Sequence, residues 1–307
     1  MAGHAPDVLD CAVIGGGPAG LTAAIYLARF HLSVTVFDAG SGRATRIPRT
    51  HNHAGFPEGI SGRTLVARMR RQATSFGTEI VRGRVDGIER HWGAFTVRAG
   101  AGSFVTRTVL VATGVTNRSP ELSPRDHARA LRLGLLRYCP ICDGYEATDE
   151  KIGVIGTGAR GTDEAIFLRG FSCDVTLVPF DRHSFERSDR ERLGAAKVTI
   201  VDRPAGRLRI AGSGRQILAC EGLHAFDTVY PALGSDIHSD LARDLGASLS
   251  EDGCVLVDAH QRTDVPGLYA AGDVVRGLDQ ISHAMGEGGV AATTIRNDIG
   301  RATPIYR

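Results

Sequence analysis

The feature that most constrains the fold is a strand, a glycine-rich turn and a helix that follow one another twice. The first copy consists of the apolar run LDCAVIG, the turn GGPAG, the helical pattern LTAAIYLARF and the β-branched run SVTVFDAG. The second begins at Lys151 and reads KIGVIG, TGARG, TDEAIFLRGF and SCDVTLVPF. Each copy is typical of a βαβ unit, which builds a parallel sheet covered by helices. The sequence therefore predicts an α/β chain with two Rossmann-like dinucleotide-binding domains, the second inserted into the first.

The segments around the second copy suggest how the chain is divided. FTVRAG and TRTVLVATG predict an antiparallel excursion that returns to a central strand, and the polar loop VTNRSPELSPRD follows. Further on, GASLSEDGCVLVD leads to the buried-strand run VPGLYAAGDVV and to an alanine-rich helix. We expect residues 1–116 and 247–307 to form the first dinucleotide-binding domain, to which the family resemblance described below assigns FAD. We expect residues 117–246 to form the inserted domain, which resembles an NAD(P)-binding domain and carries the CxxC pair.

Composition and charge exclude several classes of function. The 307 residues include 36 basic and 34 acidic side chains, and no basic block is long enough to suggest nucleic-acid binding. No stretch approaches the roughly 18 apolar residues that a membrane span needs, and the first residues lack a basic segment before a long apolar core. We therefore expect a cytoplasmic protein that binds neither nucleic acid nor membrane.

The first glycine turn is a candidate dinucleotide site. Its predicted cofactor-binding residues are Gly15, Gly17, Pro18, Ala19 and Gly20. The pattern G-x-G-x-x-G after a strand lets the backbone approach a pyrophosphate, which the helix N-terminus then stabilises. Asp38 closes the next strand 18 residues after Gly20, near the roughly 20 expected for an acid that binds a ribose hydroxyl. An ordinary tight turn is the alternative, but strand, helix and acid together favour a dinucleotide.

The second glycine turn repeats this pattern with Gly156, Gly158 and Gly161. The strand that follows ends in Pro179, Phe180, Asp181, Arg182 and His183, without the clustered arginines that hold a 2′-phosphate. Arg182 alone is a candidate for that role, whereas Asp181 favours a free ribose diol. Two interpretations stay open: binding of NADPH or NADH, or a degenerate Rossmann domain without a donor.

Cys139 and Cys142 form the only C-x-x-C of the chain, a spacing that permits a reversible disulfide. The alternative is half of a zinc site, but no second C-x-x-C or paired histidine motif is present, and we predict no metal. If the pair opens a helix through DGYEAT, the positive helix end stabilises a thiolate and makes the second sulfur easier to activate. Asp143 is then the natural general acid or base, although an ordinary acid in a first helical turn has the same place.

The motifs in order resemble the low-molecular-weight thioredoxin reductase family over nearly the whole chain. They are GGGPAG, NHAGFPEGISG, VLVATGV, CPICDGYE, TDVPGLYAAGDV and QISHAMGEGG. The resemblance implies a homodimeric flavoprotein. In such a protein FAD binds the first domain, a nicotinamide nucleotide binds the inserted one, and domain rotation alternates access to the flavin.

The resemblance also implies roles for single residues. Gly15, Gly17, Gly20 and Asp38 would hold the FAD pyrophosphate and ribose. The other flavin-binding positions it implies are Asn52, Thr113, Gly114, Asp273, Gln280 and Ile281. Asn52 precedes the turn that approaches the isoalloxazine, and Asp273 matches the acid that contacts the ribityl chain. Gln280 begins the helix aimed at the pyrimidine end, where a helix N-terminus stabilises negative charge on the reduced ring. By the same correspondence Cys142 is the sulfur nearest the flavin, and Cys139 attacks the partner disulfide.

Three segments depart from the family pattern. GTGARGT replaces the turn G-G-G-D-S, PFDRH replaces the arginine pair that recognises the NADPH phosphate, and SGRATRIPRTHNH replaces the glycine-glycine-glutamine stretch beside the flavin. The electron donor is therefore open among NADPH, NADH, ferredoxin or none. The C-terminal tail ends with an aromatic residue, Tyr306, which we consider as a side chain that stacks on the flavin.

The sequence as a whole predicts an FAD-dependent disulfide reductase. A donor would reduce FAD, the flavin would reduce the Cys139–Cys142 disulfide, and the dithiol would reduce a thioredoxin-like protein or a small-molecule disulfide. The first alternative is a dithiol oxidase that runs in the opposite direction with oxygen as acceptor. The second is a sensor-like flavoprotein whose inserted domain binds no donor.

Overall fold

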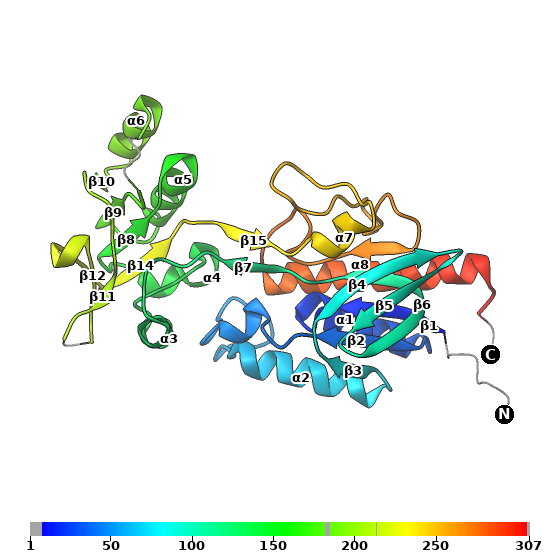
Figure 1. Cartoon of the computed structure of the whole chain (residues 1–307). Coiled ribbons are helices and arrows are strands. Elements are labelled where there is room, and N and C mark those ends of the chain that lie inside the picture. The colour runs from blue at the N-terminus through cyan, green and yellow to red at the C-terminus, as the bar shows by residue number, and fades with distance from the viewer. Residues whose placement is uncertain (1–7, 182–184, 213, 306–307) are drawn as a thin grey trace.

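The computed structural model describes residues 8–181, 185–212 and 214–305. These residues form two α/β units joined by a two-stranded ribbon (Figure 1). Each unit has a parallel sheet that begins with a strand, a glycine turn and a helix, so the predicted pair of Rossmann-like units is confirmed. Tyr306 and Arg182, which the sequence raised as candidates, lie outside the described residues.

The first sheet has seven strands in the order β3-β2-β1-β6-β5-β4, with β16 paired to β6. The strands are β1 (Leu9–Ile14), β2 (Val34–Asp38), β3 (Glu79–Arg82), β4 (Val85–His91), β5 (Ala94–Ala99), β6 (Gly102–Val111) and β16 (Leu268–Ala270). β4 and β5 run antiparallel to their neighbours, which confirms the expected excursion, and the other pairs are parallel. Every residue of β2 is buried, as expected for an apolar strand of a sheet covered on both faces.

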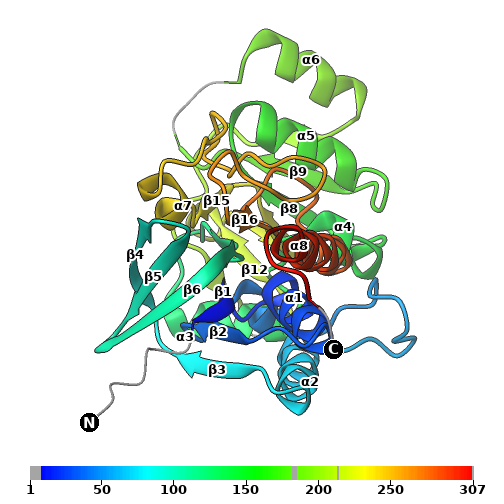
Figure 2. The same cartoon turned by 90° about the vertical axis from the view of Figure 1, so that its right-hand side faces the viewer.

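Helices α1 (Pro18–Arg29) and α8 (Ile281–Ala302) cover one face of this sheet together with α2 (Gly62–Ser75). Figure 2 shows α1 and α8 side by side, with β4, β5 and β6 on the other side of β1. The two helices approach closely because Gly288 faces Ala19: a Cβ at Gly288 would lie 2.3 Å from the Ala19 carbonyl oxygen. The short 3-10 helix η1 (Arg43–Arg46) follows β2.

The second sheet has four parallel strands in the order β10-β9-β8-β14. Its strands are β8 (Ile152–Ile155), β9 (Val175–Val178), β10 (Thr199–Ile200) and β14 (Thr228–Pro231). The helices of this unit are α3 (Pro124–Leu133), α5 (Gly158–Leu168) and α6 (Arg187–Ala195). A small antiparallel sheet contains β11 (Arg209–Ile210), β12 (Ile217–Ala219) and β13 (His224–Phe226). The short 3-10 helix η3 (Cys220–Gly222) connects β12 to β13. Two separate apolar clusters pack around the second sheet.

The two units are connected by β7 (Val115–Asn117) and β15 (Ser235–Ile237), which pair antiparallel. The redox segment α4 (Pro140–Asp143) and η2 (Tyr145–Ala147) lies beside this ribbon in Figure 1. Helix α7 (Asp240–Asp244) packs against β4 of the first sheet. The domain bounds 1–116, 117–246 and 247–307 stay a prediction.

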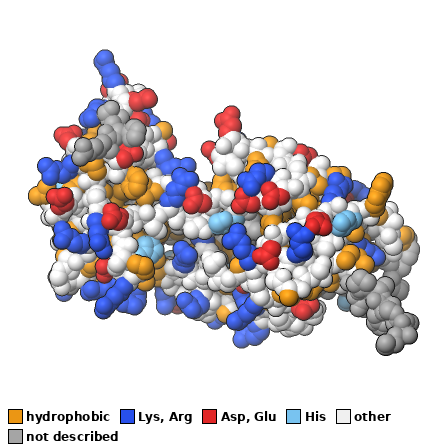
Figure 3. Space-filling model, viewed as in Figure 1, with side chains coloured by type: hydrophobic (Ala, Val, Ile, Leu, Met, Phe, Trp, Pro, Cys, Tyr) orange, Lys and Arg blue, Asp and Glu red, His pale blue; other side chains and the backbone are white. Residues whose placement is uncertain are grey.

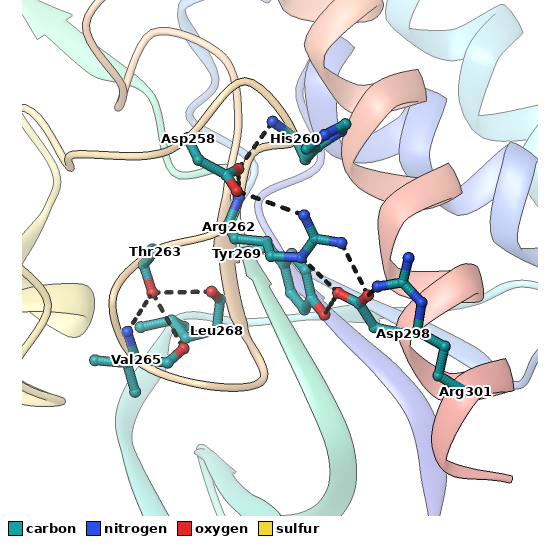
Figure 4. A network of polar contacts seen from close by, with 9 residues as sticks. All are labelled: Asp258, His260, Arg262, Thr263, Val265, Leu268, Tyr269, Asp298 and Arg301. Carbon is teal, nitrogen blue, oxygen red and sulfur yellow. Dashed lines mark hydrogen bonds and ion pairs between the residues drawn. The ribbon is translucent and has the colours of Figure 1, made fainter.

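A polar network fixes the last helix to the first sheet (Figure 4). Arg262 donates to both oxygens of Asp298 in α8, from Nε at 2.7 Å and from Nη2 at 2.9 Å, and Tyr269 of β16 donates to Asp298 at 2.9 Å. The hydrogen bonds from Arg262 hold the pKa of Asp298 below its usual range. These contacts fix the C-terminal part of α8 to the first sheet.

The surface carries both charges. On the face shown in Figure 3, arginine and acidic side chains alternate without a large patch of one sign. In the described part of the chain no helix has the length and apolar character needed to cross a membrane.

Candidate functional site

One cavity of about 960 Å³ brings the predicted first-domain site and the cysteine pair together. The predicted residues that line it are Gly15, Gly17, Pro18, Ala19, Asp38, Asn52, Thr113, Gly114, Cys139, Cys142, Asp143, Asp273, Gln280 and Ile281. Gly20 lies buried beneath the turn. Gly156, Gly158 and Gly161 do not line this cavity and lie in the turn between β8 and α5.

The turn between β1 and α1 forms a cradle of backbone. Gly15 has a φ of +123°, and a Cβ there would lie 2.1 Å from the carbonyl oxygen of Ala112. A Cβ at Gly20 would lie 2.0 Å from the carbonyl oxygen of Gly15, so only glycine allows this approach. A Cβ at Gly17, in contrast, would meet no described atom within 4 Å. The first amides of α1 are therefore open to the cavity, as an anionic pyrophosphate requires.

Asp38 lies at the end of β2, next to this cradle. A Cβ at Gly16 would lie 2.5 Å from Oδ2 of Asp38. The carboxylate accepts a hydrogen bond from the amide of Gly40 at 2.9 Å and forms an ion pair with Arg70 of α2. Its place beside the turn fits a ribose-binding acid. Arg70 was not foreseen, because nothing in the sequence indicates which helical arginine reaches β2.

At the opposite end of the cavity the cysteine pair meets the start of α8. Cys139 and Cys142 form a disulfide. Nε2 of Gln280 lies 3.2 Å from Sγ of Cys139 and 3.3 Å from Sγ of Cys142. Nδ2 of Asn52 donates to Oε1 of Gln280 at 3.1 Å and lies 3.4 Å from the carbonyl oxygen of Ile141. The structure thus brings together the redox pair and two residues that the resemblance placed at the flavin ring.

The helix that carries the pair is shorter than expected. The backbone amide of Cys142 donates a hydrogen bond to Sγ of Cys139 at 3.1 Å. The helix N-terminus therefore acts on the first cysteine, whereas we expected it to activate the second. α4 ends at Asp143 instead of continuing through DGYEAT. The hydroxyl of Tyr230 binds the carbonyl oxygen of Asp143 at 3.0 Å, while the amide of Ala147 bonds to Gly144 instead. The α-helical pattern therefore gives way to η2.

The carboxylate of Asp143 is bound by side chains of the second unit. Its Oδ1 accepts a hydrogen bond from Tyr230 of β14 at 3.1 Å, and its Oδ2 lies 3.5 Å from Nη1 of Arg137. Burial raises the pKa of Asp143 to about 6, although Arg137 and Tyr230 act in the opposite direction. A carboxyl with this pKa can both release and accept a proton near neutral pH. Sequence reasoning missed Tyr230, whose position in an apolar strand gives no signal.

Asp273 and its neighbours form a second polar group in the cavity. Nη1 of Arg43 lies 2.9 Å from Asp273 and 2.8 Å from Asp279. Burial raises the pKa of Asp273, and the charge of Asp279 adds to that rise. Arg43 belongs to the segment SGRATRIPRTHNH that departs from the family pattern, and this departure was the available signal.

The turn after β6 contributes Thr113 and Gly114. Oγ1 of Thr113 donates to the carbonyl oxygen of His238 at 2.6 Å, and Gly114 has a φ of +64°. Both residues line the cavity between the glycine cradle and the disulfide. Their position agrees with the expected turn at the strand end.

The second glycine turn also adopts a close geometry. A Cβ at Gly156 would lie 3.0 Å from Cα of Gly161. The residues after β9 are Pro179, Phe180 and Asp181, and the description of the chain stops there until residue 185. No group of three or more metal-ligating side chains occurs within the described ranges.

Comparison with known proteins agrees with this geometry. The family model for pyridine nucleotide-disulphide oxidoreductases matches residues 9–288. The chain belongs to this family. Pyridine nucleotide-disulphide oxidoreductases of the thioredoxin reductase type use FAD, and this chain is a flavin-dependent disulfide oxidoreductase.

Individual relatives confirm the resemblance to low-molecular-weight thioredoxin reductases. The thioredoxin reductase of Streptomyces coelicolor is 32% identical over 283 residues, which cover 88% of this chain and 87% of the relative. The structure of thioredoxin reductase from Streptococcus pyogenes is 29% identical, with a TM-score of 0.87 over 97% of this chain and 100% of that one. The Lactococcus lactis thioredoxin reductase structure, in its FR conformation, is 27% identical, with a TM-score of 0.61 over 95% and 99%.

Proposed function

We propose that this flavin-dependent oxidoreductase is a disulfide reductase that uses the Cys139–Cys142 pair to reduce a thioredoxin-like protein or a small-molecule disulfide. The observation that carries the proposal is the position of that disulfide. It lies at the end of the FAD-type cavity, within 3.3 Å of Gln280 at the start of α8. That position supports electron exchange between the disulfide and a bound flavin.

The residues present fit FAD along the whole cavity. The open amides after Gly17 would bind the pyrophosphate, and Asp38 would bind the ribose. Asp273 would contact the ribityl chain, and Gln280 with Ile281 would face the pyrimidine end. Bound FAD would supply the two electrons that open the disulfide.

The two cysteines then divide the reaction. The amide of Cys142 stabilises negative charge on Sγ of Cys139, which makes Cys139 the attacking thiolate. Its sulfur forms a mixed disulfide with the substrate and releases one thiolate. Cys142 attacks that bond, re-forms the Cys139–Cys142 disulfide and releases the second thiolate. The two electrons and two protons of the dithiol leave on the two product thiols, and Asp143 exchanges protons with the pair.

The arrangement of the two units bears on access to the pair. Over nearly the same share of the chain, one relative overlaps with a TM-score of 0.87 and another with 0.61. A rotation of the two units about the β7 and β15 ribbon would produce such a difference. We propose that this rotation exposes Cys139 to a protein partner, and that the chain acts as a cytoplasmic homodimer.

One observation favours a second candidate function, a dithiol oxidase with oxygen as acceptor. The residues that follow β9 are Pro179, Phe180 and Asp181, in place of the arginine pair that recognises the NADPH phosphate in the family. A weakened donor site suits a flow of electrons from a substrate dithiol to the cofactor. In that direction the dithiol loses two electrons and two protons, and oxygen takes up both to give hydrogen peroxide. For the reductase direction, NADPH, NADH and ferredoxin are the candidate donors.

Separate replacement of Cys139 and Cys142 by serine tests the proposal. Each variant should keep its bound FAD and lose turnover with a disulfide substrate. Peroxide release driven by an added dithiol, at a rate that exceeds disulfide reduction, would favour the oxidase. Disulfide reduction at the wild-type rate in either variant would overturn both directions.

A further inference from the structure

Part of the cavity lining belongs neither to the proposed flavin-binding residues nor to the redox pair. This part lies between η1 and α3, and in Figure 1 α3 lies beyond α4 as seen from α1. We call it the outer pocket, defined by Arg46, Ser119, His127, Arg132, Leu133 and Tyr138. None of these six residues is among those proposed to hold FAD or to carry the disulfide, so the outer pocket is a candidate site for a second ligand.

Arg46 gives the outer pocket an unpaired positive charge. Its side chain is exposed, and no described residue forms a hydrogen bond or an ion pair with it. Arg43, one turn earlier in η1, is by contrast bound to two aspartates. Burial lowers the pKa of His127, and the charge of Arg46 lowers it further, which places the guanidinium near the imidazole. Arg132 adds a second exposed guanidinium without a described partner.

Polar and apolar groups complete the pocket next to the disulfide. Nε2 of His127 and Oη of Tyr138 share a hydrogen bond of 2.7 Å, and Tyr138 donates to Oγ of Ser119 at 2.9 Å. Tyr138 directly precedes Cys139, so this group is fixed relative to the attacking sulfur. Leu133 is 47% exposed and offers an apolar wall on the same side.

We propose that the outer pocket binds the carboxylate end of a low-molecular-weight disulfide, or of the dithiol formed from it, with Arg46 as the charge partner. A guanidinium binds a carboxylate through two parallel hydrogen bonds, and Ser119 and Tyr138 can add neutral ones. Leu133 packs against the carbon skeleton that joins the carboxylate to the sulfur. The inference rests on the proposed function, because the ligand is the disulfide that exchanges with Cys139 and Cys142.

Two chromogenic aromatic disulfides provide a matched pair of probes. Dithiobis(nitrobenzoate) carries carboxylates, and dithiodipyridine is uncharged at neutral pH. The holoenzyme is reduced with a phosphine and desalted, so that no nicotinamide or other donor is needed. Stopped-flow absorbance then gives the second-order rate constant of thiolate release for each probe. The signal of the C139S C142S variant is subtracted, because Cys173 is exposed and also reacts.

The decisive quantity is the ratio of the anionic to the neutral rate constant. In Arg46→Ala this ratio should fall about tenfold or more, because the substitution removes the charge and both hydrogen bonds of the guanidinium. In Arg46→Lys the ratio should fall less, because lysine keeps the charge but cannot form the two parallel hydrogen bonds. Arg125→Ala is the control, since Arg125 is exposed on α3 outside the cavity lining and should keep the wild-type ratio. The flavin content of each variant shows that the fold is intact.

The outcomes separate the two proposals. An equal ratio in the wild type and in Arg46→Ala would overturn the outer pocket as an anion site and leave the proposed function standing. A fall of the same size in Arg125→Ala would also overturn it, because general surface charge would then explain the preference. If the reduced wild type released no thiolate from either probe, the proposed function would be overturned, and the inference with it.

Discussion

The hydroxyl of Tyr230 lies 3.1 Å from Oδ1 of Asp143 and 3.0 Å from the carbonyl oxygen of the same residue. Tyr230 is fully buried in β14, and Asp143 is the acid next to the redox pair. A hydroxyl that donates to a carboxylate favours its ionised form, so this bond opposes the effect of burial on the pKa. The sheet of the second unit therefore tunes the proton affinity of a residue beside the disulfide.

Replacement of Tyr230 by phenylalanine should raise the pKa of Asp143 above its value of about 6, because the carboxylate loses a donor. The free energy of unfolding should fall by about 1–2 kcal/mol, since the hydrogen bond from the buried Tyr230 hydroxyl to Asp143 is lost. The pH dependence of thiolate release checks the first effect, and urea unfolding checks the second. Tyr145→Phe is the matched control, because Tyr145 is 81% exposed. An unchanged inflection in Tyr230→Phe would contradict this account of Asp143.

The pH dependence of the wild-type rate, compared with that of Asp143→Asn, should reveal the direction of electron flow. In the reductase direction the protonated acid supplies a proton to a leaving thiolate, so the rate should fall as pH rises through about 6. In the oxidase direction the carboxylate accepts a thiol proton, and the rate should rise through the same pH. Asp143→Asn should remove this dependence and slow the step by about a hundredfold. A variant that keeps the wild-type pH profile would exclude Asp143 as the proton-transfer group.

The glycine cradle predicts two different results for two similar substitutions. Gly17→Ala adds a methyl group that meets no described protein atom, so the fold should persist while bound FAD is lost. Gly15→Ala places a methyl group 2.1 Å from a carbonyl oxygen at a φ of +123°, so the variant should misfold. Far-ultraviolet circular dichroism and the ratio of flavin to protein absorbance distinguish the two. Full flavin content in Gly17→Ala would contradict the assignment of the cradle.

The anchor of α8 predicts a pH-dependent loss of stability. Asp298→Asn should lower the free energy of unfolding at neutral pH, because the ion pair with Arg262 is lost. The loss should be only about 1–2 kcal/mol, since that pair is partly exposed. The pKa of Asp298 is lowered in the folded state. Its contribution is therefore present above the unfolded pKa of about 3.9 and is lost as pH falls through the folded pKa.

Urea unfolding at neutral pH and at low pH should show the difference between the wild type and Asp298→Asn disappear in acid. Arg301→Ala removes only a 3.3 Å contact to the same carboxylate. It should therefore lower the free energy of unfolding by less than Asp298→Asn does. A difference that persists in acid would contradict the electrostatic account of this anchor.

Local pattern predicted the two Rossmann-like units and much of the candidate site. Gly15 and Gly20 mark a turn whose backbone contacts tolerate no side chain, and such constraints appear directly in the sequence. The spacing of Cys139 and Cys142 likewise predicted their pairing, because three residues bring two sulfurs together in one helical turn.

The contacts that sequence reasoning missed join distant segments. Tyr230 and Asp143 are 87 residues apart, and the tyrosine lies in a strand whose apolar pattern only predicts burial. The ion pair between Arg70 and Asp38 depends on how α2 packs beside β2, which no local motif encodes. The early end of α4 has the same cause, since the Tyr230 hydroxyl takes a carbonyl oxygen that a longer helix would use.

The most direct test of the central claim is an anaerobic titration of the holoenzyme with NADPH, then NADH, then a dithiol, followed by the visible absorbance of the flavin. The wild type should lose flavin absorbance with the dithiol, while the C139S C142S variant should keep it, because electrons reach the flavin through the disulfide. Bleaching of the wild type by a nicotinamide would in addition identify an ordinary donor with altered recognition. Bleaching of the C139S C142S variant by the dithiol at the wild-type rate would contradict the account.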